Sequence, residues 1–267
     1  MTALDPDRLS GGLSSLTRER LTELEVFDSI DSTNTYLGSV PAPPAGRLRV
    51  AIADSQTAGR GRLNREWVSP RGQGLYQSVA YTLTGMRDDL SALTLALGVG
   101  VTEALARCGF DAVALKWPND LVALDGKLGG LLTETRMTNG TLVLTAGVGI
   151  NIAMDAATRD LAHSGWAQRG VALEDFGGPA PDRTDLAIAV TDAMTSVFLD
   201  YEASGFAGFV DRWRSVDWLS GRAIRIESPA GAEHGIADGV DEGGALLLRT
   251  ASGTRQVTAG TVTLAES

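Results

Sequence analysis

The clearest fold signal in this chain is the stretch KWPNDLVALDGKLGGLLTE, residues 116–134. Two β-prone runs, Leu121–Leu124 and Leu128–Glu134, flank the pair Asp125-Gly126. Asp-Gly is a preferred pair for a tight two-residue turn, because both central positions of that turn need positive φ. We therefore predict a β-hairpin here, preceded by a short strand at Val113–Leu115.

On either side of the hairpin, apolar runs of strand length alternate with patterns of helical period. The further predicted strands are Leu48–Ala53, Leu75–Leu83 and Leu142–Ile152. The predicted helices are Ser14–Leu24, Leu90–Gly109, Thr184–Tyr201 and Phe206–Trp213. Between the first two of these strands, Thr57 to Gly74 has no apolar period, and an irregular connection of that length is more often functional than not.

The sequence pattern changes after Trp218. Short β-like pieces separated by glycine-rich turns follow: Arg222–Glu227, Gly235–Val240, Ala245–Thr250 and Thr254–Val257. Short strands at a spacing of roughly 8–12 residues predict a small β-barrel. We therefore expect two domains, 1–218 and 219–267, with residues 1–25 as an N-terminal extension of the first.

Composition restricts the function classes. The 267 residues include 23 Lys+Arg and 33 Asp+Glu, a net charge of −10, which argues against a nucleic-acid partner. The longest apolar stretch, Leu93–Ala106, is interrupted by polar residues and is shorter than the ~20 apolar residues of a membrane span. The N-terminus has no secretory signal pattern, and we expect a soluble, cytoplasmic protein without a membrane partner.

Two familiar chemistries lack support in the sequence. The two histidines lie far apart, without carboxylate or cysteine companions at metal-ligand spacing. No G-x-S-x-G motif occurs, so a serine hydrolase would lack its usual local frame. We assign no metal ligands.

The segment Gln56-Thr-Ala-Gly-Arg-Gly-Arg62, followed by Arg65 and Trp67, is the richest in binding groups. Alternating Gly and Arg lets backbone N–H groups approach an anion while guanidinium groups hold its oxygens. Trp67 offers a flat surface on which a ring could stack. From the residues alone, an anion-binding loop and a solvated flexible loop remain equally good interpretations.

Four other segments could line a site. Lys116–Asp120 ends a strand at a sharp turn, and a simple Asp-stabilised turn is the better interpretation from spacing alone. Lys127 beside the hairpin turn is most simply a solvated lysine. The glycines of Gly126–Gly130 and Gly147–Asn151 indicate either tight packing or a ligand close to the sheet. Asp31–Asn34 could be only a helix cap.

Together and in this order, five segments resemble the biotin protein ligase family: DSTN (31–34), QTAGRGR (56–62), KWPNDL (116–121), GKLGGLLTE (126–134) and GVGINI (147–152). The resemblance implies an α+β fold in which helices flank the mixed β-sheet of a catalytic domain. That domain is of the class II aminoacyl-tRNA-synthetase-like, biotin–lipoate ligase type. A small C-terminal Src-homology-3-like β-barrel follows it.

The implied activity is that of an ATP-dependent biotin–protein ligase with two half-reactions. Biotin and ATP form biotinyl-5'-adenylate, and biotin then passes to a lysine on the biotin carrier domain of an acyl-CoA carboxylase. Mg²⁺ is expected with the phosphates. Only 30 residues precede Asp31, too few for the DNA-binding domain of some relatives, so the monofunctional type is expected. The oligomeric state stays open.

The resemblance also assigns residues. For biotin they are Ser32, Thr33, Asn34, Gln56, Gly59, Arg60, Gly61, Arg62, Lys127, Gly130 and Gly149. For the nucleotide they are Arg62, Arg65, Trp67, Lys116, Asn119, Asp120, Lys127 and Asn151. The implied catalytic residues are Lys127, Arg60, Arg62 and Asp120, with Lys127 bridging the biotin carboxylate and the α-phosphate and Asp120 as the base for the transfer to lysine.

One departure from the family pattern falls in the Gly-Arg loop. Leu63-Asn64 stands where relatives often carry a basic residue or histidine and then glycine, so we expect altered loop ordering with the chemistry retained. Two alternatives remain open: a lipoate or octanoate ligase or transferase of the same fold, and a non-catalytic biotin-binding regulator.

Overall fold

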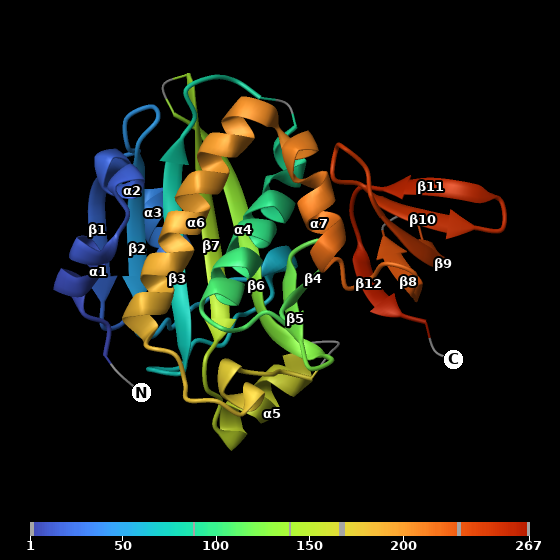
Figure 1. The fold of residues 1–267 in the computed structure, drawn as a ribbon, viewed down its shortest axis with the longest axis horizontal. Helices are drawn as coiled ribbons and strands as arrows, with labels where there is room; N and C mark the ends of the chain where they lie inside the picture. The colour runs from blue at the N-terminus through green and yellow to red at the C-terminus, as the bar shows by residue number, and fades with distance from the viewer. Residues whose placement is uncertain (1–2, 88, 139, 166–168, 229–230, 266–267) are drawn as a thin grey trace.

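Most of the chain is built around one seven-stranded sheet, seen in a computed structural model that describes residues 3–87, 89–138, 140–165, 169–228 and 231–265. The strand order is β1-β2-β3-β7-β6-β5-β4 (Figure 1). The strands are β1 (Leu21–Phe27), β2 (Leu48–Ala53), β3 (Gly74–Thr82), β4 (Ala114–Lys116), β5 (Asp120–Ala123), β6 (Gly126–Thr138) and β7 (Thr141–Asn151). Only the β1–β2 pair is parallel among these neighbours, so the sheet is mixed, as expected.

The predicted hairpin is present as β5 and β6, but its turn lies one residue earlier than predicted. Ala123 pairs with Gly126, so Leu124 and Asp125 occupy the two turn positions, with φ of 49° and 54°. Gly126 instead begins β6, where an added Cβ would lie 2.4 Å from Val171. Close packing, and not the turn, therefore requires this glycine.

Helices α4 (Leu93–Arg107) and α6 (Arg183–Ser204) cover one face of the sheet, and α3 (Thr33–Ser39) lies on the other (Figure 1). The two predicted long helices are thus confirmed. The aromatic ring of Tyr81 on β3 stacks on Phe198 of α6 at 5.0 Å between centroids. The core lies between this helix layer and the sheet. The opposite face of the sheet carries α3 and is not covered by α4 and α6.

Helix α4 explains the most apolar stretch of the sequence. The window Leu90–Arg107 is 18 residues long, has a mean hydropathy of 1.3 and would suffice for a membrane span by length and composition. In the structure 67% of this window is buried inside the fold. Its apolar character is therefore that of a core helix packed against α6 and the sheet.

The N-terminal prediction is wrong in part. The helix predicted over Ser14–Leu24 ends at Arg20, and the chain continues directly as strand β1. That shortened helix is α2 (Ser15–Arg20). Two other short helices, α1 (Pro6–Gly12) and α5 (Ala156–Gly165), were not predicted. The predicted helix Phe206–Trp213 is present as the pair η4 (Phe206–Phe209) and α7 (Val210–Val216).

The C-terminal residues form a second, antiparallel sheet of the barrel-like kind predicted, in the order β11-β10-β9-β8-β12. Its strands are β8 (Ala223–Ser228), β9 (Gly231–Val240), β10 (Leu246–Thr250), β11 (Gly253–Val257) and β12 (Thr261–Leu264). The last strand was not predicted. The Trp117 indole N–H donates to the Gly244 carbonyl at 3.1 Å, which fixes this sheet against the β4–β5 turn.

Candidate active site

A pocket lies on the α3 face of the large sheet. Its residues come from α3, from the connection between β2 and β3, and from β3 to β7, with β12 at the rim: Ser32, Thr33, Asn34, Gln56, Arg60, Gly61, Arg62, Leu63, Arg65, Glu66, Trp67, Gln77, Ser78, Lys116, Trp117, Pro118, Asn119, Asp120, Lys127, Gly130, Leu131, Leu132, Gly147, Val148, Gly149, Gly260, Thr261 and Val262. The pocket and its open mouth together hold about 1120 Å³.

Two glycines of β7 form the floor of the pocket. A Cβ on Gly147 would lie 2.4 Å from Asn34 Oδ1, and a Cβ on Gly149 would lie 2.5 Å from Trp67 Nε1. Side chains of the pocket therefore rest directly on the strand at these two positions. Tight packing is therefore present at Gly147 and Gly149, and the packed groups belong to the site itself.

One end of the pocket is a network of uncharged polar groups. The Thr33 backbone N–H donates to Gln56 Oε1 at 2.9 Å, and the Thr33 hydroxyl lies 2.7 Å from that of Ser78. Ser78 also donates to Asn34 Oδ1 at 2.6 Å. Thr33, Asn34 and Ser78 are buried, so they present a fixed set of donors and acceptors to a ligand.

Ser32 shows why α3 begins where it does. Its side chain caps the helix by accepting from the Thr35 N–H at 3.5 Å, so the Asp31–Asn34 segment is a helix cap. The same cap turns Thr33 and Asn34 toward the sheet and into the pocket. The two interpretations of this segment are compatible.

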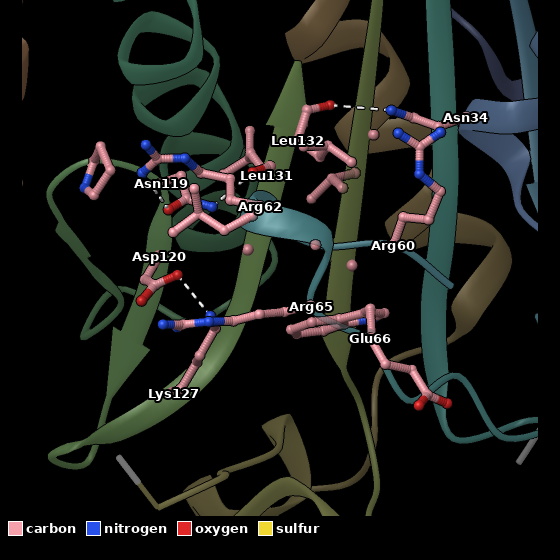
Figure 2. Close-up of a pocket in the computed structure, with 18 of the residues that line it drawn as sticks. Asn34, Arg60, Arg62, Arg65, Glu66, Asn119, Asp120, Lys127, Leu131 and Leu132 are labelled. Atoms are coloured by element: carbon pink, nitrogen blue, oxygen red, sulfur yellow. Dashed lines mark hydrogen bonds and ion pairs between the residues drawn. The ribbon is translucent and has the colours of Figure 1, made fainter. Parts of the chain in front are cut away.

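The opposite end of the pocket is charged. Lys127, near the start of β6, holds its Nζ 2.7 Å from Asp120 Oδ1 and 5.6 Å from the centre of the Trp67 ring. Arg62 reaches Asn119 Oδ1 at 3.5 Å. Figure 2 shows Lys127, Asp120, Asn119 and Arg62 together at this end, while Arg60 and Asn34 lie at the other. This arrangement separates the two arginines of the Gly-Arg motif.

Burial lowers the pKa of two basic side chains of the pocket. Desolvation lowers the pKa of Arg62, against the opposing effect of the nearby Asp120. Desolvation also lowers the pKa of Lys116, which is 5% exposed, and Lys127 adds to that effect while Asp120 opposes it. Several basic side chains, Arg62, Lys116 and Lys127, share this end with Asp120, so an anionic ligand would be favoured there.

The Gly-Arg segment folds as a small hairpin, Gly59–Trp67. The Gly61 N–H donates to the Arg65 carbonyl at 2.8 Å, and the Trp67 N–H donates to the Gly59 carbonyl at 2.9 Å. The short turn η1 (Arg62–Asn64) closes it, with Leu63 and Asn64 at φ of 56° and 57°. The residues that depart from the family pattern therefore form the tip, where Leu63 is exposed.

All but two of the predicted site residues line the pocket. Gly59 is not among the lining residues; it begins the hairpin, where an added Cβ would lie 2.3 Å from the Trp67 carbonyl oxygen. Asn151 is buried, and its side-chain amide donates to the Val171 carbonyl at 3.0 Å. Sequence reasoning did not single out Ser78, which reads as core of a strand, or the rim residues Gly260–Val262, which come from the other end of the chain.

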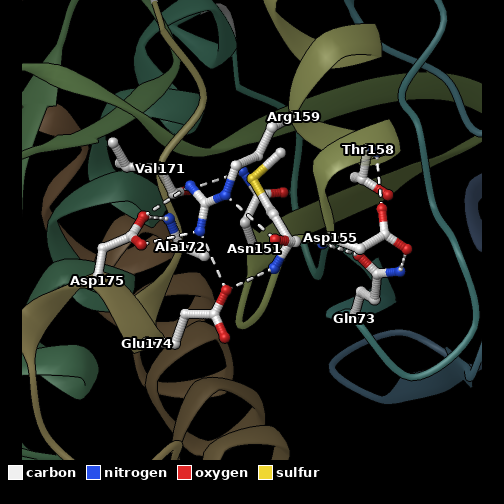
Figure 3. Close-up of polar contacts among 10 residues, drawn as sticks. Gln73, Asn151, Asp155, Thr158, Arg159, Val171, Ala172, Glu174 and Asp175 are labelled. Carbon is white, nitrogen blue, oxygen red and sulfur yellow. Dashed lines mark hydrogen bonds and ion pairs between the residues drawn. The ribbon is translucent and has the colours of Figure 1, made fainter.

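Asn151 belongs to a support beneath the charged end (Figure 3). Arg159 of α5 pairs with Glu174 at 3.1 Å and with Asp175 at 2.8 Å. These contacts fix a segment whose Val171 N–H donates to the Lys127 carbonyl at 3.0 Å. The backbone at Lys127 is thereby held from both sides, by strand β5 and by this segment.

The acidic residues do not form a dense metal cage. Within the described ranges, no group of three or more His, Cys, Asp or Glu is placed to hold a metal ion. Asn119 and Asp120 nevertheless supply side-chain oxygens at the charged end.

Comparison with known protein families identifies the class of protein that has this fold and pocket. Residues 26–151 match the model of the biotin/lipoate A/B protein ligase family, and residues 219–264 match the model of the biotin protein ligase C terminal domain. The chain therefore belongs to the biotin protein ligase family, which confirms the resemblance inferred from its motifs.

Relatives of known name agree with this assignment. The bifunctional ligase/repressor BirA of Salmonella typhimurium is 34% identical over 249 residues, which span 92% of this chain and 73% of that one. A biotin--[acetyl-CoA-carboxylase] ligase of Mycobacterium tuberculosis is 30% identical over 90% of this chain and 88% of its own length. The biotin protein ligase from Aquifex aeolicus, solved in complex with biotin and ATP, matches with a TM-score of 0.76 at 28% identity. That match covers 92% of this chain and 100% of the Aquifex chain.

Proposed function

We propose that this chain is an ATP-dependent biotin–protein ligase. A carboxylate oxygen of biotin attacks the α-phosphorus of ATP, the bond from that phosphorus to the β-phosphate breaks, and pyrophosphate leaves. The ε-amine of a carrier lysine then attacks the acyl carbon of biotinyl-5'-adenylate, and AMP leaves. The observation that carries this proposal is one pocket in which buried hydroxyl and amide groups gather at one end and basic side chains at the other, in a chain of this family.

The polar end suits the ureido ring of biotin. That ring offers two N–H donors and one carbonyl acceptor, all uncharged. Thr33, Asn34, Gln56 and Ser78 supply complementary hydroxyl and amide groups, held in place by their bonds to one another. A ligand fixed by these groups would extend its carboxylate along β7 toward Lys127.

The cationic end suits the first half-reaction. Two anions, a carboxylate and a triphosphate, must approach each other, so the protein has to supply positive charge and orientation. Lys127 would bridge the carboxylate and the α-phosphate, while Arg62 would hold phosphate oxygens. Trp67 would pack against the adenylate. Mg²⁺, when bound with the phosphates next to Asn119 and Asp120, would neutralise part of their charge.

The second half-reaction needs a proton acceptor near the acyl carbon. Asp120 lies 2.7 Å from Lys127 Nζ and is the acidic side chain of the charged end. We assign it the proton of the incoming ammonium of the carrier lysine. That lysine belongs to a biotin carrier domain of an acyl-CoA carboxylase. We assign residues 219–267 to a separate domain, whose strand β12 borders the entrance of the pocket.

The same proposal covers the setting of the reaction. A net charge of −10 disfavours a nucleic-acid partner, and we place the enzyme in the cytoplasm with its ATP supply. The expected substrates are biotin, ATP and the carrier lysine.

Pyrophosphate release tests the proposal directly. With ATP and biotin we expect a burst of pyrophosphate, and sustained turnover once a biotin carrier domain is added. Lipoate and octanoate replace biotin in parallel samples. Release with lipoate or octanoate and not with biotin would retain the fold and reassign the substrate, whereas biotin binding without release would identify a regulator instead of an enzyme.

A further inference from the structure

Glu134 on β6 joins the hairpin Gly59–Trp67 to the polar end of the pocket. One oxygen of its carboxylate, Oε2, accepts a hydrogen bond from Asn34 Nδ2 at 3.0 Å. The other oxygen, Oε1, pairs with the guanidinium of Arg60. Arg60 also donates to the Thr35 hydroxyl at 3.4 Å. One carboxylate thus connects Asn34 of α3, at the polar end of the pocket, with Arg60 of the hairpin.

This geometry gives Arg60 a place different from that of Arg62. Arg60 lies beside Asn34, at the end of the pocket away from Lys127 and Asp120 (Figure 2). Its charge is matched by Glu134, while Arg62 faces the charged end. We infer that Arg60 closes the hairpin through Glu134 and that Arg62 handles phosphate.

Resting on the proposed function, we propose that Glu134 is a positioning residue that holds the Gly59–Trp67 hairpin closed and so retains biotinyl-adenylate between the two half-reactions. The adenylate is a mixed anhydride that reacts with water and with amines. An enzyme that makes it in one step and uses it in the next must keep it enclosed meanwhile. The Arg60–Glu134 pair lies at the polar end of the pocket, where the proposed function puts the ureido ring of biotin. The bonds that form and break lie at the opposite, charged end.

The Arg60–Glu134 ion pair is weak enough to break when the hairpin opens. The Arg60 and Glu134 side chains are 42% and 36% exposed, so their pair is partly screened by water. Breaking it should shift the open population of the hairpin by about fivefold, the range expected of such a pair. The effect should appear in retention of the intermediate and in biotin affinity, since both depend on the closed form.

The test compares Glu134→Gln with wild type in the absence of carrier, where a burst of pyrophosphate reports adenylation and the following steady phase reports escape of the adenylate. We expect an unchanged burst rate, a steady phase about fivefold faster and a biotin KM raised to a similar extent. Labelling of added serum albumin measures the escaped adenylate independently. The chain holds just two lysines, Lys116 and Lys127, both in the pocket, so little label is lost to its own surface.

Glu103→Gln is the matched control. It breaks the Glu103–Arg212 pair, whose side chains are 39% and 37% exposed, far from the pocket. This variant should match wild type in both phases. Arg60→Gln should likewise raise the steady phase, and the steady phase of the double variant should be no faster than that of the faster single one, as expected of two residues that act through one contact.

Two results would decide against the inference. A steady-phase rate of Glu134→Gln equal to that of wild type would show that Glu134 does not hold the hairpin closed. A lowered biotin KM would mean that Glu134 holds Arg60 away from the ligand. A loss of the melting transition would shift the test to Arg60→Gln, whose steady phase must then rise. A wild-type enzyme with no biotin-dependent burst would instead refute the proposed function, which keeps the two failures separate.

Discussion

Lys127→Met removes the charge that the first half-reaction depends on most. The lysine Nζ lies 2.7 Å from Asp120 Oδ1, and the side chain is 17% exposed. Methionine keeps most of the apolar stem and so leaves the contact with Trp67 largely filled. The expected result is a severe loss of adenylation in a protein that still folds.

The magnitude follows from charge and distance. Two unit charges 4 Å apart at an effective dielectric constant of about 20 interact by ~4 kcal/mol. Removal of a preorganised group that stabilises transition-state charge typically costs ~2.7–4 kcal/mol, or about 10²–10³ in rate. The Lys127 and Asp120 side chains are 17% and 19% exposed, between exposed and fully buried pairs, so the loss of the lysine should lower the free energy of unfolding by ~1–2 kcal/mol.

Single-turnover pyrophosphate release with saturating biotin and ATP measures the rate, and urea denaturation measures the stability. Lys127→Arg keeps a charge with a different shape, and it should retain more activity than Lys127→Met. Adenylation by Lys127→Met within fivefold of wild type would refute the role of Lys127. A loss of several kcal/mol in stability would show that the hairpin fold, and not the reaction, requires this residue.

Three further substitutions test other parts of the structure. Gly149→Ala places a Cβ 2.5 Å from Trp67 Nε1, so the indole must move; we expect altered tryptophan fluorescence and a biotin KM raised about tenfold. Arg183→Met removes a buried arginine paired with Asp54 at 2.5 Å and should lower the free energy of unfolding by ~3 kcal/mol in urea. Burial lowers the pKa of Lys116 below 10.5, so the folded state loses this proton before the unfolded state does. Lys116→Met should therefore be stabilised relative to wild type at pH 7, and this advantage should shrink as the pH rises toward 10.5.

Local pattern was sufficient for the strands that carry the pocket. Strand β2 matches its predicted range, and β3 and β7 are each shifted by one residue. Strand β1 escaped because leucines at 16, 21 and 24 give a helix-like spacing, and the strand forms by parallel pairing with β2. Strand β12 likewise depends on pairing with β8, a contact remote in sequence.

The site was predictable where its residues cluster in short glycine-rich motifs. Ser78 was missed because a serine in a strand buried along its whole length has no local mark of function. Glu134 lies in the GKLGGLLTE motif but had no predicted role, because its partner Arg60 is distant in sequence and only the fold places the two side chains in contact. The signal that could have found both is spatial: each contacts Asn34.

The choice of basic residues in the chain suits an enzyme with an amine-reactive intermediate. Two lysines among 23 basic residues leave 21 arginines, and a guanidinium stays protonated and is a poor nucleophile. Both lysines lie in the pocket, where Lys127 faces Asp120 and Lys116 is 5% exposed. An adenylate that escapes therefore meets its first accessible lysines on other proteins, so the accuracy of biotin transfer depends on how long the hairpin stays closed over the pocket.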